Sequence, residues 1–189
     1  MGSRITILVV GAFLALCVRV SDALAPRVAL ATPVPLVRPA FTEVIEVRPV
    51  LAVAEGTRRY ANLVEAASRA HGVDADLVHA VIFAESAYDA RAVSAAGASG
   101  LMQLMPETAA RYGVKNRMDP SQNILGGARY LGDLLRLFHN NMHLAIAAYN
   151  AGEGSVLKYG RKIPPYPETV AYVPKVLAYY KTYKKSRFA

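Results

Sequence analysis

Cysteine is nearly absent from this chain of 189 residues, since the only one is Cys17, inside an apolar stretch near the N-terminus. If that stretch is removed on export, the mature protein has no cysteine, which excludes disulfide bonds and thiolate chemistry. Strand-like alternation is also missing after residue 57, and no segment of the chain repeats. Helical spacing prevails there, so the sequence predicts an all-α domain.

Acidic residues are few beside the basic ones, with 14 Asp and Glu against 22 Lys and Arg and a formal net charge of +8. Such an excess suits an anionic partner such as nucleic acid, a membrane surface or an acidic cell-wall polymer. A scattered excess is typical of a solvated surface, so we do not expect nucleic acid as a partner. The basic residues are scattered except for a C-terminal cluster of Lys181, Lys184, Lys185 and Arg187.

Residues 1–25 have the pattern of a secretory signal peptide. Arg4 gives a positive start, residues 5–18 are almost all apolar or small, and Ala23-Leu24-Ala25 offers an A-x-A cleavage site. We therefore expect export across the inner membrane to the periplasm or the cell wall. Contact with the membrane is expected only through an uncleaved signal.

Residues 26–56 contain five prolines among Val, Ala and Arg. No helical period survives so many prolines, so we expect a proline-rich linker or stalk, with a short strand near residues 41–47 as an alternative. The globular part is then residues 57–189, which we expect to be monomeric.

Helices are predicted from apolar periodicity and from terminal signals. Asp74 is expected to cap one helix, and Asp119 another, which begins with Pro120. The expected helices cover residues 57–71, 74–86, 106–113, 120–138, 143–149 and 168–185, the last interrupted at Pro174.

Glu85 lies near the end of the second of these helices. Val78, Ile82 and Glu85 follow the spacing i, i+4, i+7, so the carboxylate shares a face with apolar side chains. In a dry cleft, burial would raise the pKa of this carboxyl and let it hold a proton near neutral pH, as a general acid does. From this helix alone, a glutamate capped by solvent or by Arg91 is the commoner explanation.

Three stretches of the sequence carry a family resemblance. They are Glu85-Ser86 with the following loop, the stretch from Gly100 to Pro106 (GLMQLMP), and Ala148-Tyr149-Asn150-Ala151-Gly152. With DPSQNILGGARYL at 119–131 and PETVAYV at 167–173, in this order and spacing, they resemble the soluble, family 1 type of lytic transglycosylase. The resemblance covers about residues 60–180.

This resemblance implies a lysozyme-like, all-α fold around a sugar-binding groove. It implies cleavage of peptidoglycan between N-acetylmuramic acid and N-acetylglucosamine, with formation of a 1,6-anhydro ring by attack of the muramic acid's own C6 hydroxyl. One carboxyl, acting first as acid and then as base, suffices for that reaction, whereas ordinary glycosidases need two. Neither a metal nor another cofactor is implied.

The resemblance also assigns roles to single residues. Glu85 is the expected catalytic acid and base, and Tyr149 is expected to bring its hydroxyl near it. Ser86 and Glu168 are expected to have structural roles beside the site. The substrate-binding residues are expected to be Ser94, Gln103, Met105, Tyr149, Asn150 and Tyr172.

Several residues are expected to stay outside the chemistry. Asp89, four residues after Glu85, is not used by the family pattern. His139 and His143 have the spacing of half a zinc site, but no third ligand is apparent. His79 resembles an ordinary surface or helix-end histidine. Glu153 stands where the family often has a proline or a polar residue, so we expect it at the rim of the groove.

Two alternative functions remain open. A hydrolase of the muramidase type would use the same acid but admit water. A non-catalytic cell-wall-binding module would keep the groove without the reaction. By family analogy, the partner beyond peptidoglycan is a secretion or conjugation apparatus.

Overall fold

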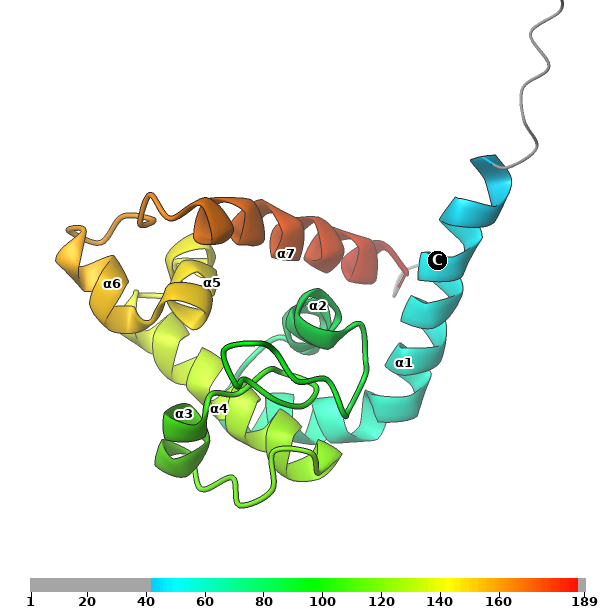
Figure 1. The fold of residues 1–189 in the computed structure, drawn as a ribbon, viewed down its shortest axis with the longest axis horizontal. Coiled ribbons are helices and arrows are strands. Elements are labelled where there is room, and N and C mark those ends of the chain that lie inside the picture. The colour runs from blue at the N-terminus through cyan, green and yellow to red at the C-terminus, as the bar shows by residue number, and fades with distance from the viewer. Residues whose placement is uncertain (1–41, 187–189) are drawn as a thin grey trace, which may run out of the picture. The chain divides into compact units, whose positions relative to one another are not determined.

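The computed structural model describes residues 42–186, with side chains from residue 55 onward (Figure 1). The expected signal at residues 1–25, with Cys17, and residues 26–41 of the expected stalk lie outside the described residues. The described part contains helices α1 to α7 and isolated bridges, but no strand. The all-α prediction is therefore confirmed.

Helix α1 covers Thr42–His71, so the extended stalk expected for residues 26–56 is wrong over residues 42–56. The alternative strand is wrong as well over residues 42–47, which are helical. Four of the five prolines precede residue 42, and a single interior proline, Pro49, removes only one helical hydrogen bond. The predicted apolar stripe at the other end of α1 is buried, through Tyr60, Val64 and Ala67.

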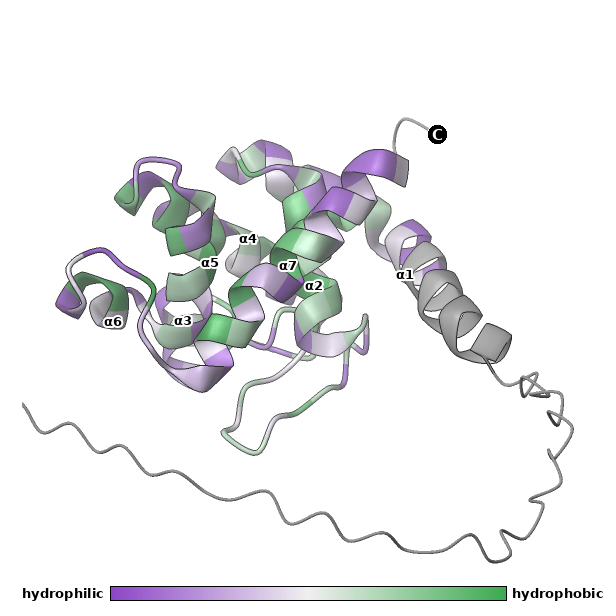
Figure 2. Cartoon of the chain, turned by 90° about the horizontal axis from the view of Figure 1, so that it is seen from above, coloured by the Kyte–Doolittle hydropathy of each residue, from purple (hydrophilic) through white to green (hydrophobic). Residues whose placement is uncertain are grey.

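Helix α2 (Ala75–Ser86) lies between α1 and α7 (Pro167–Ser186) and packs against both (Figure 1). It is largely apolar along its length (Figure 2). Asp74 caps it as predicted, accepting a hydrogen bond from the Asp76 N–H at 2.9 Å. Ala87 and Tyr88 then adopt the left-handed conformation, with φ of 48° and 68°. The helix thus ends just after Glu85 and Ser86, and a loop begins.

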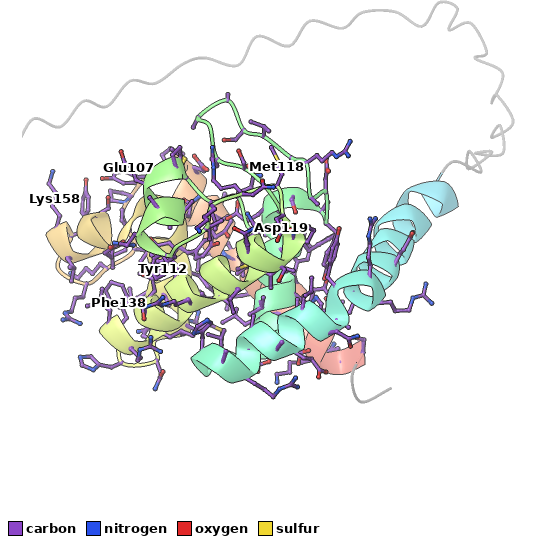
Figure 3. All side chains as sticks on the ribbon, turned by 90° about the horizontal axis from the view of Figure 1, so that it is seen from below. Glu107, Tyr112, Met118, Asp119, Phe138 and Lys158 are labelled. Carbon is purple, nitrogen blue, oxygen red and sulfur yellow. The ribbon has the colours of Figure 1, made fainter. Side chains whose placement is uncertain are left out.

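Three further helices follow that loop. They are α3 (Pro106–Arg111), α4 (Pro120–Leu137) and α5 (Met142–Ala151). Asp119 caps α4 as predicted, and Figure 3 shows it at the start of that helix. Helix α4 packs against α1 and α5, and α5 packs against α7. Gly127 of α4 leaves room for the loop, because a Cβ there would lie 2.4 Å from the sulfur of Met102.

Two features of the second half differ from the prediction. Glu153–Lys158 forms a short helix, α6, which the sequence did not suggest. Helix α7 is not interrupted at Pro174 but runs through it. Pro174 itself is exposed, and the buried neighbours Val173 and Val176 hold the helix to the core across the missing hydrogen bond. Within the described range, no helix is long and apolar enough to cross a bilayer.

Candidate active site

Glu85 lines a pocket of about 280 Å³ between α2, α5 and α7. Helix α7 supplies most of its wall, because its residues at i, i+3, i+4 and i+7 share one face. Glu85 is partly buried, so one side of the carboxyl meets protein and the other meets the pocket. The other lining residues are Ala84, Asn150, Glu168, Ala171, Tyr172 and Lys175.

The buried hydroxyl of Tyr172 donates a hydrogen bond to Oε1 of Glu85 at 2.5 Å. Burial raises the pKa of Glu85 from 4.5 to about 7, while the Tyr172 hydroxyl and the charge of Lys175 oppose the rise and Glu168 adds to it. Burial outweighs the opposing contacts. The carboxyl is therefore poised to release and accept a proton near neutral pH.

Lys175 is a pocket residue that the sequence analysis missed. Its Nζ donates to the carbonyl of Ala84 at 3.0 Å, which satisfies an acceptor in the last turn of α2 next to Glu85. The signal was available, because Lys175 lies three residues after Tyr172 on the same helix face. Its charge is the only positive one among the residues that line the pocket.

Asn150 ties the end of α5 to the start of α7. Its amide donates to Oε1 of Glu168 at 3.1 Å, and its carbonyl oxygen accepts from the Thr169 hydroxyl at 2.7 Å. The structure thus brings Asn150, Glu168 and Tyr172 together around Glu85, all from the expected set. Glu168 is exposed and engaged by Asn150, which is consistent with a structural role beside the site.

Tyr149 lies near Glu85 but does not hydrogen-bond to it. Its hydroxyl donates to the carbonyl of Met102 at 2.9 Å. Burial and the neighbouring Glu85 raise the pKa of Tyr149 well above its usual value. The contact to the acid comes from Tyr172, so Tyr149 instead holds the GLMQLMP stretch against α5.

The Ser86 hydroxyl contacts two backbone carbonyls, so it is not free to take part in proton transfer. Its hydroxyl bonds back to the carbonyl of Ile82 at 3.1 Å and reaches that of Leu101 at 2.8 Å. The second contact ties the end of α2 to the same stretch that Tyr149 holds.

Ser94, Gln103 and Met105 do not line the pocket that contains Glu85. The Ser94 hydroxyl oxygen accepts from the Ala98 N–H at 3.0 Å and shapes its own turn. The Gln103 amide donates to the carbonyls of Ala92 at 3.0 Å and Gly100 at 2.9 Å. Met105 is 42% exposed at the start of α3, on the loop side of the site.

Asn123 holds the loop between α2 and α3 in place, and this role was not predicted from the sequence. It is fully buried, accepts from the Met102 N–H at 2.7 Å, and donates to the carbonyls of Ser99 at 3.0 Å and Arg117 at 2.8 Å. Gly100 must be glycine here, because its φ is 80° and a Cβ would lie 2.1 Å from the Arg117 oxygen. A polar residue beside Ile124 on an inward helix face was the available signal.

Asp89, His139 and His143 do not line the pocket that contains Glu85. Asp89 is exposed, and its carboxylate accepts from the Arg91 N–H at 2.8 Å within the loop. His139 and His143 do not share a helix, since His139 lies in the turn between α4 and α5 with a φ of 53°. Among the described residues, no three His, Cys, Asp or Glu side chains gather as metal ligands.

Comparison with known proteins bears on this geometry. The family model described as Transglycosylase SLT domain matches residues 62–166. The chain belongs to this family. The resemblance drawn from its motifs is thus confirmed, and so is the lysozyme-like helical fold.

Two curated relatives illustrate the match. Membrane-bound lytic murein transglycosylase F 1 of Alkalilimnicola ehrlichii is 42% identical over 108 residues, which cover 54% of this chain and 22% of that protein. The transglycosylase of Enterobacteria phage PRD1 is 39% identical over 115 residues, which cover 61% and 43%. The chain therefore spans less than half the length of these relatives.

Solved structures of lytic transglycosylases have the same fold. The 70 kDa soluble lytic transglycosylase of Escherichia coli matches with a TM-score of 0.61 and 31% identity over 68% of this chain and 24% of that one. The Slt enzyme of Pseudomonas aeruginosa, solved as an inactive variant with glutamate replaced by glutamine, matches with a TM-score of 0.62 and 31% identity over 69% and 24%.

Proposed function

We propose that this protein is a peptidoglycan lytic transglycosylase that cleaves the bond between N-acetylmuramic acid and N-acetylglucosamine. The observation that carries the proposal is the state of Glu85: one partly buried carboxyl in a pocket, with a pKa of about 7 and a hydrogen bond from Tyr172. The relatives named as lytic murein transglycosylases support the choice of substrate.

The geometry divides the two oxygens of Glu85 between two tasks. Oε1 accepts the Tyr172 hydroxyl, while Oε2 has no hydrogen-bond partner among the described residues. We therefore assign the proton of the acid to Oε2, because Oε1 already accepts the Tyr172 hydroxyl. In the first step Oε2 donates this proton to the glycosidic oxygen, the bond from that oxygen to the anomeric carbon breaks, and the N-acetylglucosamine end of the strand leaves.

The second step closes the ring. The C6 hydroxyl of the same muramic acid attacks its anomeric carbon, and its proton passes to Oε2 of Glu85. The enzyme returns to its starting protonation state, and no water is consumed. Tyr172 stabilises the carboxylate that exists between the two steps, because a hydroxyl donor favours the charged form.

We do not expect the other nearby carboxylates to supply a second catalytic group. Glu168 lines the pocket but is held by the Asn150 amide, and Asp89 is exposed in the loop and bonded to the Arg91 N–H. A retaining or inverting glycosidase requires a nucleophile or a base opposite its acid. Internal attack by the C6 hydroxyl removes that requirement, so the arrangement favours the anhydro-forming reaction over the muramidase alternative.

Export to the periplasm or the cell wall is part of the same proposal, because peptidoglycan lies there. Its support is the signal-like pattern of residues 1–25 and the cell-wall substrate in the names of the relatives. A secretion or conjugation apparatus is proposed as the machine served, on family analogy alone.

Product mass tests the reaction. Purified peptidoglycan is digested with the full chain and, in parallel, with the Glu85→Gln variant. The masses of the soluble muropeptides are then measured by mass spectrometry. We expect anhydro products, one water lighter than hydrolysis products, from the wild type only. Hydrated products would indicate a muramidase, and binding without release would indicate a wall-binding module.

A further inference from the structure

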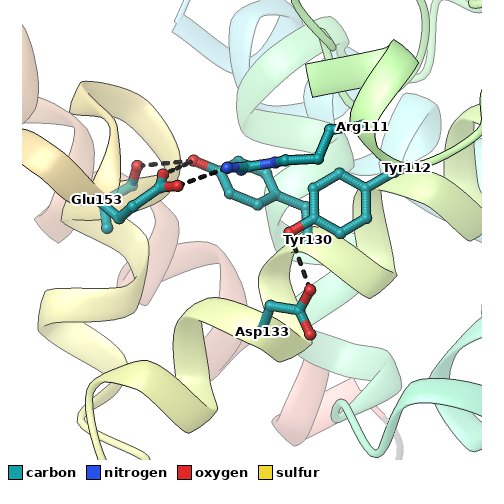
Figure 4. Close-up of polar contacts among 6 residues, drawn as sticks. Arg111, Tyr112, Tyr130, Asp133 and Glu153 are labelled. Carbon is teal, nitrogen blue, oxygen red and sulfur yellow. Dashed lines mark hydrogen bonds and ion pairs between the residues drawn. The ribbon is translucent and has the colours of Figure 1, made fainter. Parts of the chain in front are cut away.

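Charged and aromatic side chains connect α3, α4 and α6 (Figure 4). Arg111 pairs with Glu153 at 2.7 Å, and the Tyr130 hydroxyl donates to the other oxygen of the same carboxylate at 3.1 Å. The guanidinium of Arg111 lies 5.0 Å from the ring centre of Tyr112 and 5.2 Å from that of Tyr130. We call Arg111, Tyr130 and Glu153 the clasp.

The clasp contacts the helix that carries Tyr149 and Asn150. The rings of Tyr130 and Tyr149 are 5.2 Å apart, and the Tyr130 hydroxyl lies 3.3 Å from the Ala148 carbonyl. Glu153 follows Gly152, whose φ of 82° ends α5 and starts α6. Only two residues separate Asn150 from Glu153, so the place of Glu153 constrains how the last turn of α5 is directed.

Arg111 connects the clasp to the loop side of the active site. Arg111 is the last residue of α3, which starts immediately after Met105. This helix packs only lightly against α4, and its buried residue Ala109 belongs to a small cluster apart from the main core, with Leu104 and Val114. A short helix with so little core contact depends on side-chain contacts for its position.

We propose that Arg111 and Glu153 are positioning residues of the active site: their ion pair holds the GLMQLMP loop and α3 at a set distance from Tyr149 and Asn150. This inference rests on the proposed function. Tyr130 transmits the contact, since it bonds to Glu153 and packs against Tyr149. Arg111 keeps Glu153 ionised, lowering the pKa of its carboxyl, so the pair is intact at neutral pH.

Glu153→Gln tests the ion pair, because it removes the charge but keeps an acceptor for Tyr130. The partners are half-exposed, so the pair is worth at most a modest amount, and we expect kcat on soluble glycan strands to fall roughly two- to fivefold. The melting temperature should change no more than in Glu65→Gln. That matched control breaks an exposed ion pair with Arg69 on α1, and its kcat should equal that of the wild type.

A double-variant cycle and salt separate positioning from a general loss of stability. Arg111→Gln should lower kcat as Glu153→Gln does, and the double variant should be no slower than either single one. Added salt should slow the wild type and Glu65→Gln at saturating substrate, but leave the clasp variants unchanged. Full turnover in Glu153→Gln, or additive losses in the double variant, would overturn the inference. A wild type that releases nothing would instead refute the proposed function.

Discussion

At the scale of single residues, opposing effects of burial and neighbouring groups set the pKa of Glu85. Burial raises the pKa of its carboxyl, while Tyr172 and Lys175 lower it, and the balance lies at about 7. The sequence predicted that Glu85 faces inward, from its spacing with Val78 and Ile82. Its hydroxyl donor was not predicted, because the family motif placed the Tyr149 hydroxyl near Glu85 and assigned Tyr172 to substrate binding. Apolar periodicity does not identify a polar partner 87 residues away.

The raised pKa of Glu85 predicts a pH-dependent stability. Between pH 4.5 and about 7 the folded state keeps a proton that the unfolded state has released, so stability falls as the pH rises through this window. Glu85→Gln lacks that proton equilibrium. We expect it to gain up to about 3 kcal/mol relative to the wild type at pH 8 and almost nothing at pH 4. Urea unfolding at both pH values measures this, and an equal difference at both would show that Glu85 has an ordinary pKa.

Tyr172→Phe should move the pH profile of the reaction. The acid works when protonated, so activity falls as the pH rises through the pKa of Glu85. Removal of the hydroxyl donor raises this pKa further, and the basic limb of kcat/KM should shift to higher pH while the maximal rate drops. Tyr149→Phe is the matched control, because its hydroxyl bonds to Met102 and not to Glu85. Equal shifts in both variants would contradict the assignment.

At the scale of elements, the helices were easier to predict than the loop they support. Asp74 and Asp119 are local signals, and both cap the helices predicted for them. The start of α1 and the continuity of α7 were missed, because proline was treated as a stop although one interior proline can be tolerated. Ser94 and Gln103 hydrogen-bond within the loop, and substrate contact by either residue stays a prediction.

The loop between α2 and α3 depends on Asn123. Asn123→Ala would leave the Met102 N–H and the carbonyls of Ser99 and Arg117 without their buried partner. We expect a loss of roughly 2–4 kcal/mol in the free energy of unfolding. Ser121→Ala, on the exposed side of the same helix turn, should be nearly neutral. Equal stabilities in urea would mean that the loop does not need this side chain.

At the scale of the whole domain, a buried polar contact joins its first and last described helices. The Tyr88 hydroxyl lies 2.8 Å from that of Tyr183 in α7, 2.8 Å from Nδ1 of His79 in α2, and 3.3 Å from the Thr57 hydroxyl in α1. His79 is only 5% exposed and lies inside α2, so its description as an ordinary surface or helix-end histidine is wrong. This contact could not be predicted from the sequence, because the partners meet only in the folded chain.

Tyr88→Phe tests how far this contact stabilises the domain. It keeps the ring, which stacks on Tyr60, and removes the hydroxyl shared by α1, α2 and α7. We expect a loss of about 1–3 kcal/mol in the free energy of unfolding. Tyr159→Phe, at a residue that is 39% exposed, is the control. A Tyr88→Phe domain as stable as this control would show that the helices are joined by apolar packing alone.

The central claim is that Glu85 drives an internal attack without water, and digestion of peptidoglycan in water enriched in heavy oxygen tests it most directly. Hydrolysis must place a solvent oxygen on the new end of the muramic acid, whereas attack by the C6 hydroxyl places none there. We predict muropeptides that carry no heavy oxygen at that carbon, released by the wild type and not by Glu85→Gln. Labelled reducing ends, or release by Glu85→Gln at the wild-type rate, would contradict the account.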